Sequence, residues 1–147
     1  MKTGKKEVRI IFAIISVLFI ILPILLSSCS HPFPYQGSLT GNWSGQLTVL
    51  GRNIPAGGTI SITVDAKGVG SGTVTLSSGG AAAAKIEAQV DSNGNLTGTV
   101  SFTLSGTTFV SNWQGKITAS GNSLNVQGTW TSDHGSGTFS GTGTSSK

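Results

Sequence analysis

Hydrophobic and polar residues alternate along most of the chain, from Thr40 to Gly143. A period of two places successive side chains on opposite faces of the backbone, which is typical of β-strands that bury one face only. No stretch of this region repeats its apolar residues at the spacing of a helix. The alternation predicts eight strands, at residues 40–50, 58–65, 70–78, 84–91, 95–104, 108–119, 122–132 and 136–143.

The segments between these strands are short and rich in glycine and asparagine, the residues that tight hairpin turns require. Residues 92–95, 120–122 and 133–135 are examples. Consecutive hairpins produce an antiparallel meander. We therefore expect one all-β domain at residues 40–147, an antiparallel up-and-down β-barrel of about eight strands, because closure removes both exposed sheet edges. A two-sheet β-sandwich is the alternative, although short hairpins leave little chain for the crossovers that a sandwich needs.

The apolar residues of the predicted strands share one face, which we expect to form the core, and the opposite face is rich in threonine, serine, asparagine and glutamine. The predicted core residues are Trp43, Leu47, Val49, Ile60, Ile62, Val64, Val74, Leu76, Ile86, Val90, Leu96, Val100, Phe102, Leu104, Phe109, Trp113, Ile117, Leu124, Val126, Trp130 and Phe139.

Four aromatic core residues, Trp43, Trp113, Trp130 and Phe139, each have glycine two residues away on the same face. Glycine weakens a strand unless a bend, a bulge or a neighbouring ring uses the space that it leaves. In one interpretation the rings lie over the glycines and fill the interior. In the other, the same four residues line an open lumen and bind a small apolar ligand.

The first 28 residues follow a different pattern. A basic stretch, Lys2 to Arg9, precedes an apolar run over residues 10–26, and small residues follow. This order predicts a secretory signal peptide at residues 1–28, with a helical apolar part. A short transmembrane anchor formed by residues 10–26 is the alternative.

The residues Leu26-Ser27-Ser28-Cys29 resemble the lipobox of bacterial lipoproteins. The resemblance implies cleavage between Ser28 and Cys29 and attachment of diacylglycerol and a further acyl chain to Cys29, so that membrane lipid is the partner. The mature chain would be exported in a bacterium and anchored in the outer leaflet of the cytoplasmic membrane or in the outer membrane. Residues 29–39 are expected to be the lipidated cysteine and a flexible tether.

The residues Ser38-Leu39-Thr40-Gly41-Asn42-Trp43 are similar to the start of the avidins, and the Gly-x-Trp within them resembles the first lipocalin motif. Both families are eight-stranded up-and-down barrels that hold small ligands at the open end. The chain departs from both patterns, because its only tyrosine is Tyr35 and it has no arginine near the last strand. The resemblance therefore implies a barrel with a lumen, but not biotin binding.

Charge and composition argue against a nucleic-acid partner and against catalysis. The formal charge of +4 comes mainly from the first nine residues, and the chain from Cys29 onward has five basic and four acidic residues, so no nucleic-acid partner is expected. The only adjacent acid and imidazole, Asp133 and His134, lie in a predicted turn, and no metal or cofactor is expected. We expect a non-enzymatic protein: a carrier of a small apolar ligand or, alternatively, a structural or protein- or glycan-binding module of the cell envelope with a filled barrel.

Overall fold

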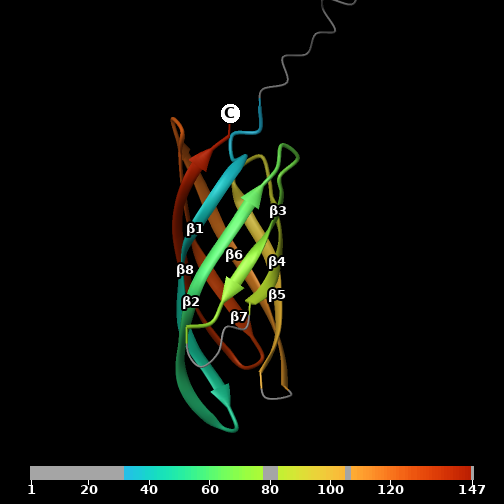
Figure 1. The fold of residues 1–147 in the computed structure, drawn as a ribbon, viewed down its shortest axis with the longest axis vertical. Coiled ribbons are helices and arrows are strands. Elements are labelled where there is room, and N and C mark those ends of the chain that lie inside the picture. Colours follow the sequence, from blue (N-terminus) through green and yellow to red (C-terminus); the bar gives the residue numbers. More distant parts are fainter. Residues whose placement is uncertain (1–31, 78–82, 105–106, 147) are drawn as a thin grey trace, which may run out of the picture. The chain divides into compact units, whose positions relative to one another are not determined.

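A single sheet of eight strands makes up the computed structural model, which describes residues 32–77, 83–104 and 107–146 (Figure 1). Each strand pairs antiparallel with the next, and β8 pairs with β1, so the sheet closes into a barrel. The up-and-down barrel is therefore confirmed, and the sandwich alternative is wrong. The strands are β1 (Gly37–Val49), β2 (Arg52–Val64), β3 (Val69–Thr75), β4 (Ala83–Val90), β5 (Asn95–Leu104), β6 (Thr107–Ser120), β7 (Ser123–Ser132) and β8 (Gly135–Ser145).

Strand β2 begins earlier than its sequence predicts. Residues 51–57 contain two glycines and Pro55, a composition that indicates a loop. In the structure β1 and β2 pair as far as Val49 and Arg52, so that the turn consists of Leu50 and Gly51 alone. Proline is tolerated here because β3 pairs with β2 only from Ile60 onward, which leaves the neighbouring part of β2 as a sheet edge.

The barrel interior holds the predicted core. Inward-facing residues of all eight strands are buried, and the alternation adds Leu39, Ala84 and Ala88 to the predicted set. Val49, Leu76 and Phe102 are only partly buried. The side chain of Leu104, the last predicted core residue on β5, lies outside the described residues.

Inside the barrel, large rings also lie beside glycines of other strands. A Cβ atom added to Gly45 would lie 2.5 Å from Trp130, and one added to Gly128 would lie 2.6 Å from Phe139. At Gly58 the added Cβ would lie 2.8 Å from the indole nitrogen of Trp43. The glycines are therefore required because backbone carbonyl oxygens and rings of other strands both occupy the space beside them.

The end of the barrel at which the described chain enters and leaves is covered by residues 32–36 (Figure 1). Phe33 and Tyr35 pack against the core there, with ring centroids 5.5 Å apart. The amide N–H of Ser146 donates to the carbonyl oxygen of Gln36 at 3.1 Å. Within the segment expected to be a tether, the chain is thus held to the barrel from Phe33 onward. We call residues 32–36 the aromatic strap.

The compact unit is Pro32–Lys147. The predicted signal peptide at residues 1–28, together with Cys29, lies outside the described residues. No helix in the described part of the chain is long and apolar enough to cross a membrane.

Candidate functional site

The four residues predicted to line a lumen do meet in the barrel. Trp43, Trp113, Trp130 and Phe139 come from β1, β6, β7 and β8, and all are buried. Trp43 lies edge-on to Trp130, with ring centroids 5.5 Å apart, and Trp113 lies 4.9 Å from Phe139. These four side chains form one aromatic cluster, and they contact one another rather than surrounding a space.

The polar atom of each indole ring is already used within the protein. Trp43 Nε1 donates to the carbonyl oxygen of Thr75 at 2.9 Å, and Trp130 Nε1 donates to that of Ser44 at 3.2 Å. Trp113 Nε1 donates to the hydroxyl oxygen of Ser111 at 2.9 Å. Because all three donors have partners, the aromatic cluster offers no free N–H group to orient a ligand.

Ser111 is a buried polar residue that the sequence analysis did not single out. Its position between Phe109 and Trp113 in an alternating strand would have placed it inside the barrel. Its hydroxyl accepts from Trp113 and reaches the carbonyl oxygen of Val100 at 3.4 Å. Ser111 therefore serves the packing of Trp113.

The space that remains inside the barrel is small. A cavity of about 20 Å³ lies inside the barrel, beside Leu47, Val74, Val100 and the three tryptophans of the aromatic cluster. A cavity of this size has room for about one water molecule. The structure thus favours the interpretation that the side chains fill the barrel, and a ligand could enter the lumen only if the aromatic cluster rearranged.

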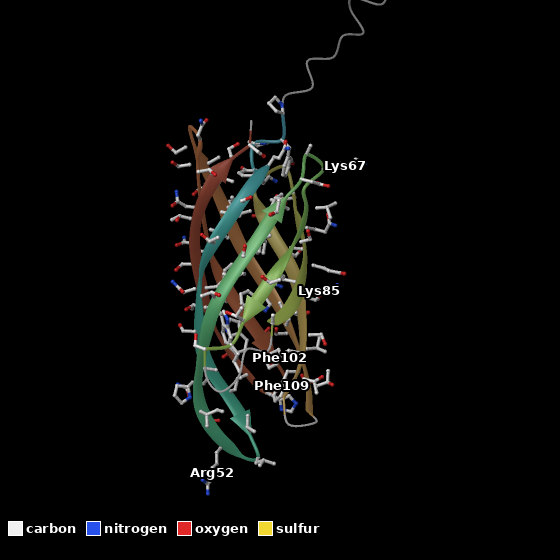
Figure 2. The ribbon with its side chains drawn as sticks, in the orientation of Figure 1. Arg52, Lys67, Lys85, Phe102 and Phe109 are labelled. Atoms are coloured by element: carbon white, nitrogen blue, oxygen red, sulfur yellow. The ribbon has the colours of Figure 1, made fainter. Side chains whose placement is uncertain are left out.

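Aromatic rings also close the end of the barrel opposite the strap. Phe102 stacks on Phe109 with ring centroids 5.1 Å apart, and His134 lies edge-on to Phe109 at 4.9 Å (Figure 2). The imidazole of the adjacent Asp133-His134 pair therefore packs against a core ring. Among the described residues, no three His, Cys, Asp or Glu side chains gather in a group that could hold a metal ion.

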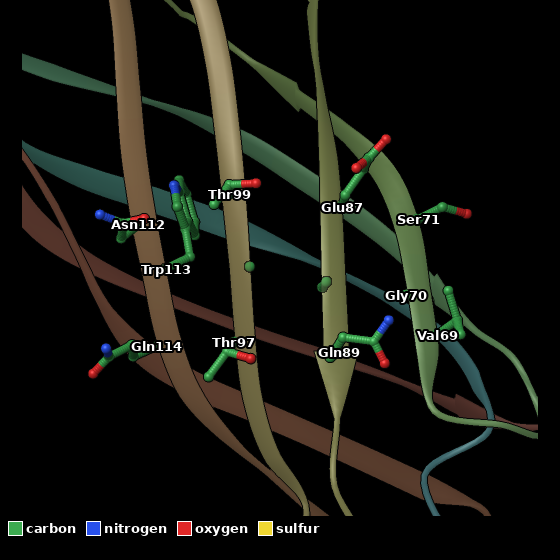
Figure 3. A pocket seen from close by; sticks show the side chains of 12 residues that line it. Val69, Gly70, Ser71, Glu87, Gln89, Thr97, Thr99, Asn112, Trp113 and Gln114 are labelled. Carbon is green, nitrogen blue, oxygen red and sulfur yellow. The ribbon is translucent and has the colours of Figure 1, made fainter.

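The larger hollows of the molecule lie on its outer surface. One hollow of about 580 Å³ crosses β3 to β6, where Glu87, Gln89, Thr97 and Asn112 project outward and Trp113 lies behind the strands (Figure 3). Two further hollows, of about 650 and 540 Å³, cross β1, β6, β7 and β8. These two adjoin, because both are lined by Asn42, Lys116, Gln127 and Ser140.

The strand register arranges the outward side chains around these two hollows in rows. In one row Asn42 pairs with Ser140, Ser140 with Gln127, and Gln127 with Lys116. Parallel rows lie on either side, and all members are exposed. We call these three rows the hydroxyl–amide face. The first row is Thr40, Thr142, Asn125 and Thr118, and the central row is Asn42, Ser140, Gln127 and Lys116. The third row is Ser44, Thr138, Thr129 and Gln114.

Charge is nearly absent from the hydroxyl–amide face. Lys116 is its one ionisable residue, and Lys116 Nζ donates to the carbonyl oxygen of Asn93 at 2.6 Å and to Asn95 Oδ1 at 3.1 Å. The other side chains present hydroxyl and amide groups, and each of these groups both donates and accepts hydrogen bonds. The arrangement suits an uncharged, hydroxyl-rich ligand better than an ionic one.

Comparisons with known proteins identify no family. A scan against protein-family models finds no match, and a search of curated proteins finds no similar sequence. The closed eight-stranded antiparallel barrel is compatible with the architecture of the lipocalins and avidins.

Proposed function

We propose that this protein is a non-enzymatic bacterial lipoprotein whose filled barrel binds neutral polysaccharide of the cell envelope through the hydroxyl–amide face. The observation that carries this proposal is the contrast between inside and outside. The cavity inside the barrel measures about 20 Å³, whereas the two adjoining outer hollows measure about 650 and 540 Å³. This contrast supports binding on the outer surface.

The chemistry of the hydroxyl–amide face supports a sugar ligand. Rows of exposed side chains repeat across neighbouring strands at about 4.8 Å, so that hydrogen-bonding groups recur regularly along an extended ligand. Asn42 and Gln127 stand in the central row and carry an amide each, which can donate to one sugar oxygen and accept from another. A single lysine gives an ionic polymer little to pair with.

The anchor supports access to the envelope. The lipobox-like residues 26–29 lie outside the described residues, but the aromatic strap begins three residues after Cys29. An acylated Cys29 would therefore hold the barrel close to a membrane surface, within about 11 Å at an extended length of about 3.5 Å per residue. Two or more acyl chains make such anchoring stable.

Co-sedimentation with chitin, an uncharged polymer that carries hydroxyl and acetamido groups, tests the binding face, and purified peptidoglycan sacculi, whose peptides carry carboxylates, serve as the ionic comparison. We expect the combined Asn42→Ala and Gln127→Ala variant of the Pro32–Lys147 unit to bind about tenfold more weakly, because two central amides are lost. Both side chains are exposed, so that stability should change little. The matched control removes Gln89 and Asn112, an amide pair from the hollow in Figure 3. Equal binding by both variants would contradict the proposal.

The anchor is tested separately. In cells producing the full chain, we expect Cys29→Ala to accumulate as an uncleaved precursor, whereas the wild type gains the mass of its lipid and fractionates with membranes. Normal cleavage and fractionation of Cys29→Ala would exclude the lipoprotein assignment and leave the polysaccharide proposal untouched.

A further inference from the structure

The hairpin between β1 and β2 projects beyond the rest of the barrel. Strand β8 pairs with β1 only as far as Leu47, and β3 pairs with β2 only from Ile60 onward. The two strands nevertheless remain paired with each other down to Val49 and Arg52. Figure 1 shows this hairpin extending past the other strands, at the end opposite the C-terminus. We call residues 48–56 the distal hairpin.

The distal hairpin is ordered and its edge resists strand addition. The hydroxyl of Thr48 donates to Asn53 Oδ1 at 2.7 Å across the two strands. Pro55 lies in the part of β2 that β3 does not pair with, and it removes one N–H donor there. We therefore expect a partner to contact the side chains at the tip rather than to join the sheet.

Leu50 occupies an unfavourable place at that tip. Its φ is 51° and that of Gly51 is 73°, as a two-residue hairpin turn with a left-handed first position requires. Asparagine, aspartate or glycine is favoured at such a position, and Leu50 is the only described residue other than glycine in this region of φ. Three other turns place Gly68, Gly94 or Gly121 there.

The same leucine is also fully exposed. Its side chain is 99% accessible, more than that of any other large hydrophobic residue in the described chain. Ile54, on the same hairpin, is 39% accessible. Leu50 therefore carries two costs at once, a left-handed backbone and an apolar side chain in water, and an asparagine would remove both.

Charge at the tip indicates the chemistry of a partner. Arg52 is the only charged residue of the distal hairpin, is exposed and follows Leu50 by two positions (Figure 2). A guanidinium pairs best with carboxylates, and an exposed leucine is buried best in an apolar pocket. One leucine and one arginine are too little to hold a protein on a lipid surface.

We propose that the distal hairpin is a docking site for a second protein, with Leu50 as the anchor in an apolar pocket and Arg52 paired with carboxylates at its rim. This interaction is independent of the polysaccharide and of the lipid anchor. The cost of placing leucine in a left-handed turn is then offset when the partner buries it.

The backbone strain at Leu50 is tested on the isolated Pro32–Lys147 unit, which we call the barrel unit. We expect Leu50→Asn to raise the melting temperature by about 3 °C, because asparagine tolerates the left-handed conformation. Leu50→Ala keeps the backbone penalty and should melt within about 1 °C of the wild type. A Leu50→Asn variant that melts no higher than Leu50→Ala would overturn the argument from strain.

The partner is tested with a photo-crosslinking amino acid placed at position 50 of the full chain in its own cells. The matched control carries the crosslinker at Val69, which is 43% accessible and lies near the opposite end. The protein captured at position 50 is then purified and titrated with variants. We expect Leu50→Ala and Leu50→Asn to weaken its affinity about tenfold or more, Arg52→Glu to weaken it similarly, and Val69→Ala to leave it unchanged.

Three results would overturn the docking proposal. The first is labelling at position 50 no stronger than at position 69. The second is an adduct with lipid or with another copy of this chain instead of a different protein. The third is a purified partner whose affinity stays within about twofold when Leu50 or Arg52 is replaced.

Discussion

Two turns near the aromatic strap, at residues 65–69 and 91–95, share the same hydrogen-bonding pattern and the same placement of glycine. Asp65 and Asp91 each accept backbone N–H groups two and four residues further on, and Gly68 and Gly94 take φ values of 80° and 82°. The ring of Phe33 lies over the first of these glycines and that of Tyr35 over the second. The carboxylates order the turns, and the glycines leave room for the rings.

Replacing Gly94 by alanine should destabilise the barrel strongly. The new Cβ would meet the carbonyl oxygen of Ile117 and lie 2.7 Å from Tyr35 Cζ. Gly121→Ala is the matched control, because Gly121 also has a positive φ, 59°, but nothing lies within 4 Å of its added Cβ. We expect Gly121→Ala to cost about 1 kcal/mol for the backbone and Gly94→Ala about 2 kcal/mol more for the overlap, measured by urea unfolding.

Asp91 should make stability depend on acid pH. Hydrogen bonds from the backbone and side chain of Asn95 hold the pKa of Asp91 below its ordinary value of 3.8. A lowered pKa in the folded state contributes stability above the unfolded pKa, and this contribution is lost as the pH falls through the folded value. We therefore expect Asp91→Asn to be less stable than the wild type at pH 7, with a gap that closes below about pH 4.

Urea unfolding between pH 7 and the acid limit of folding measures this gap. Ser92→Ala changes the same turn without touching the carboxylate, so its difference from the wild type should not vary with pH. A gap for Asp91→Asn that stays constant through the acid range would show that the carboxylate does not contribute in this way.

Among the structural elements, the aromatic strap departs furthest from expectation. A segment with two prolines and no alternation indicates a spacer, yet Phe33 and Tyr35 pack on the core and Gln36 accepts from Ser146. The packing depends on turns far along the chain, at Gly68 and Gly94. No local pattern around residue 33 carries that information.

Removing the rings of the strap tests its role. We expect combined replacement of Phe33 and Tyr35 by alanine to lower the unfolding free energy of the Pro32–Lys147 unit by about 2–3 kcal/mol, because two partly buried aromatic side chains leave the core. Pro34→Ala, between them, should change it by less than about 0.5 kcal/mol. Equal stability of the ring-less variant and the wild type would indicate a free tether.

For the whole molecule, the filled interior makes a prediction that separates a carrier from a surface-binding protein. With about 20 Å³ of free space and three paired indole N–H groups, the barrel should purify without a bound small molecule. We expect native mass spectrometry of the barrel unit to give the mass of the chain alone. Tryptophan emission should be that of buried indoles and unchanged by fatty acids; a stoichiometric adduct or ligand-dependent quenching would instead show a lumen that opens.

Strands and turns could be predicted because their signals are local. Alternation places neighbouring side chains on opposite faces whatever the rest of the chain does, so β5 and β7 differ from expectation by at most one residue at an end. The distal hairpin could not be predicted, because glycine and proline, present here as Gly51 and Pro55, are also typical of loops. Proline fits at position 55 because β3 does not pair with this part of β2, and that is known only from the sheet.

The sequence by itself determined the eight-stranded meander, its apolar inner face and the four aromatic residues that meet inside it, because a period of two and the demands of tight turns act between near neighbours. Only the tertiary structure decided whether those four residues surround a ligand or fill the barrel. That outcome depends on the register of the closed sheet, which sets Phe139 over Gly128 of the strand beside it and Trp130 over Gly45, which lies two strands away. The same closure brings Asn42 of β1 into one row with Gln127 of β7, and so creates the outer face on which the proposed function rests.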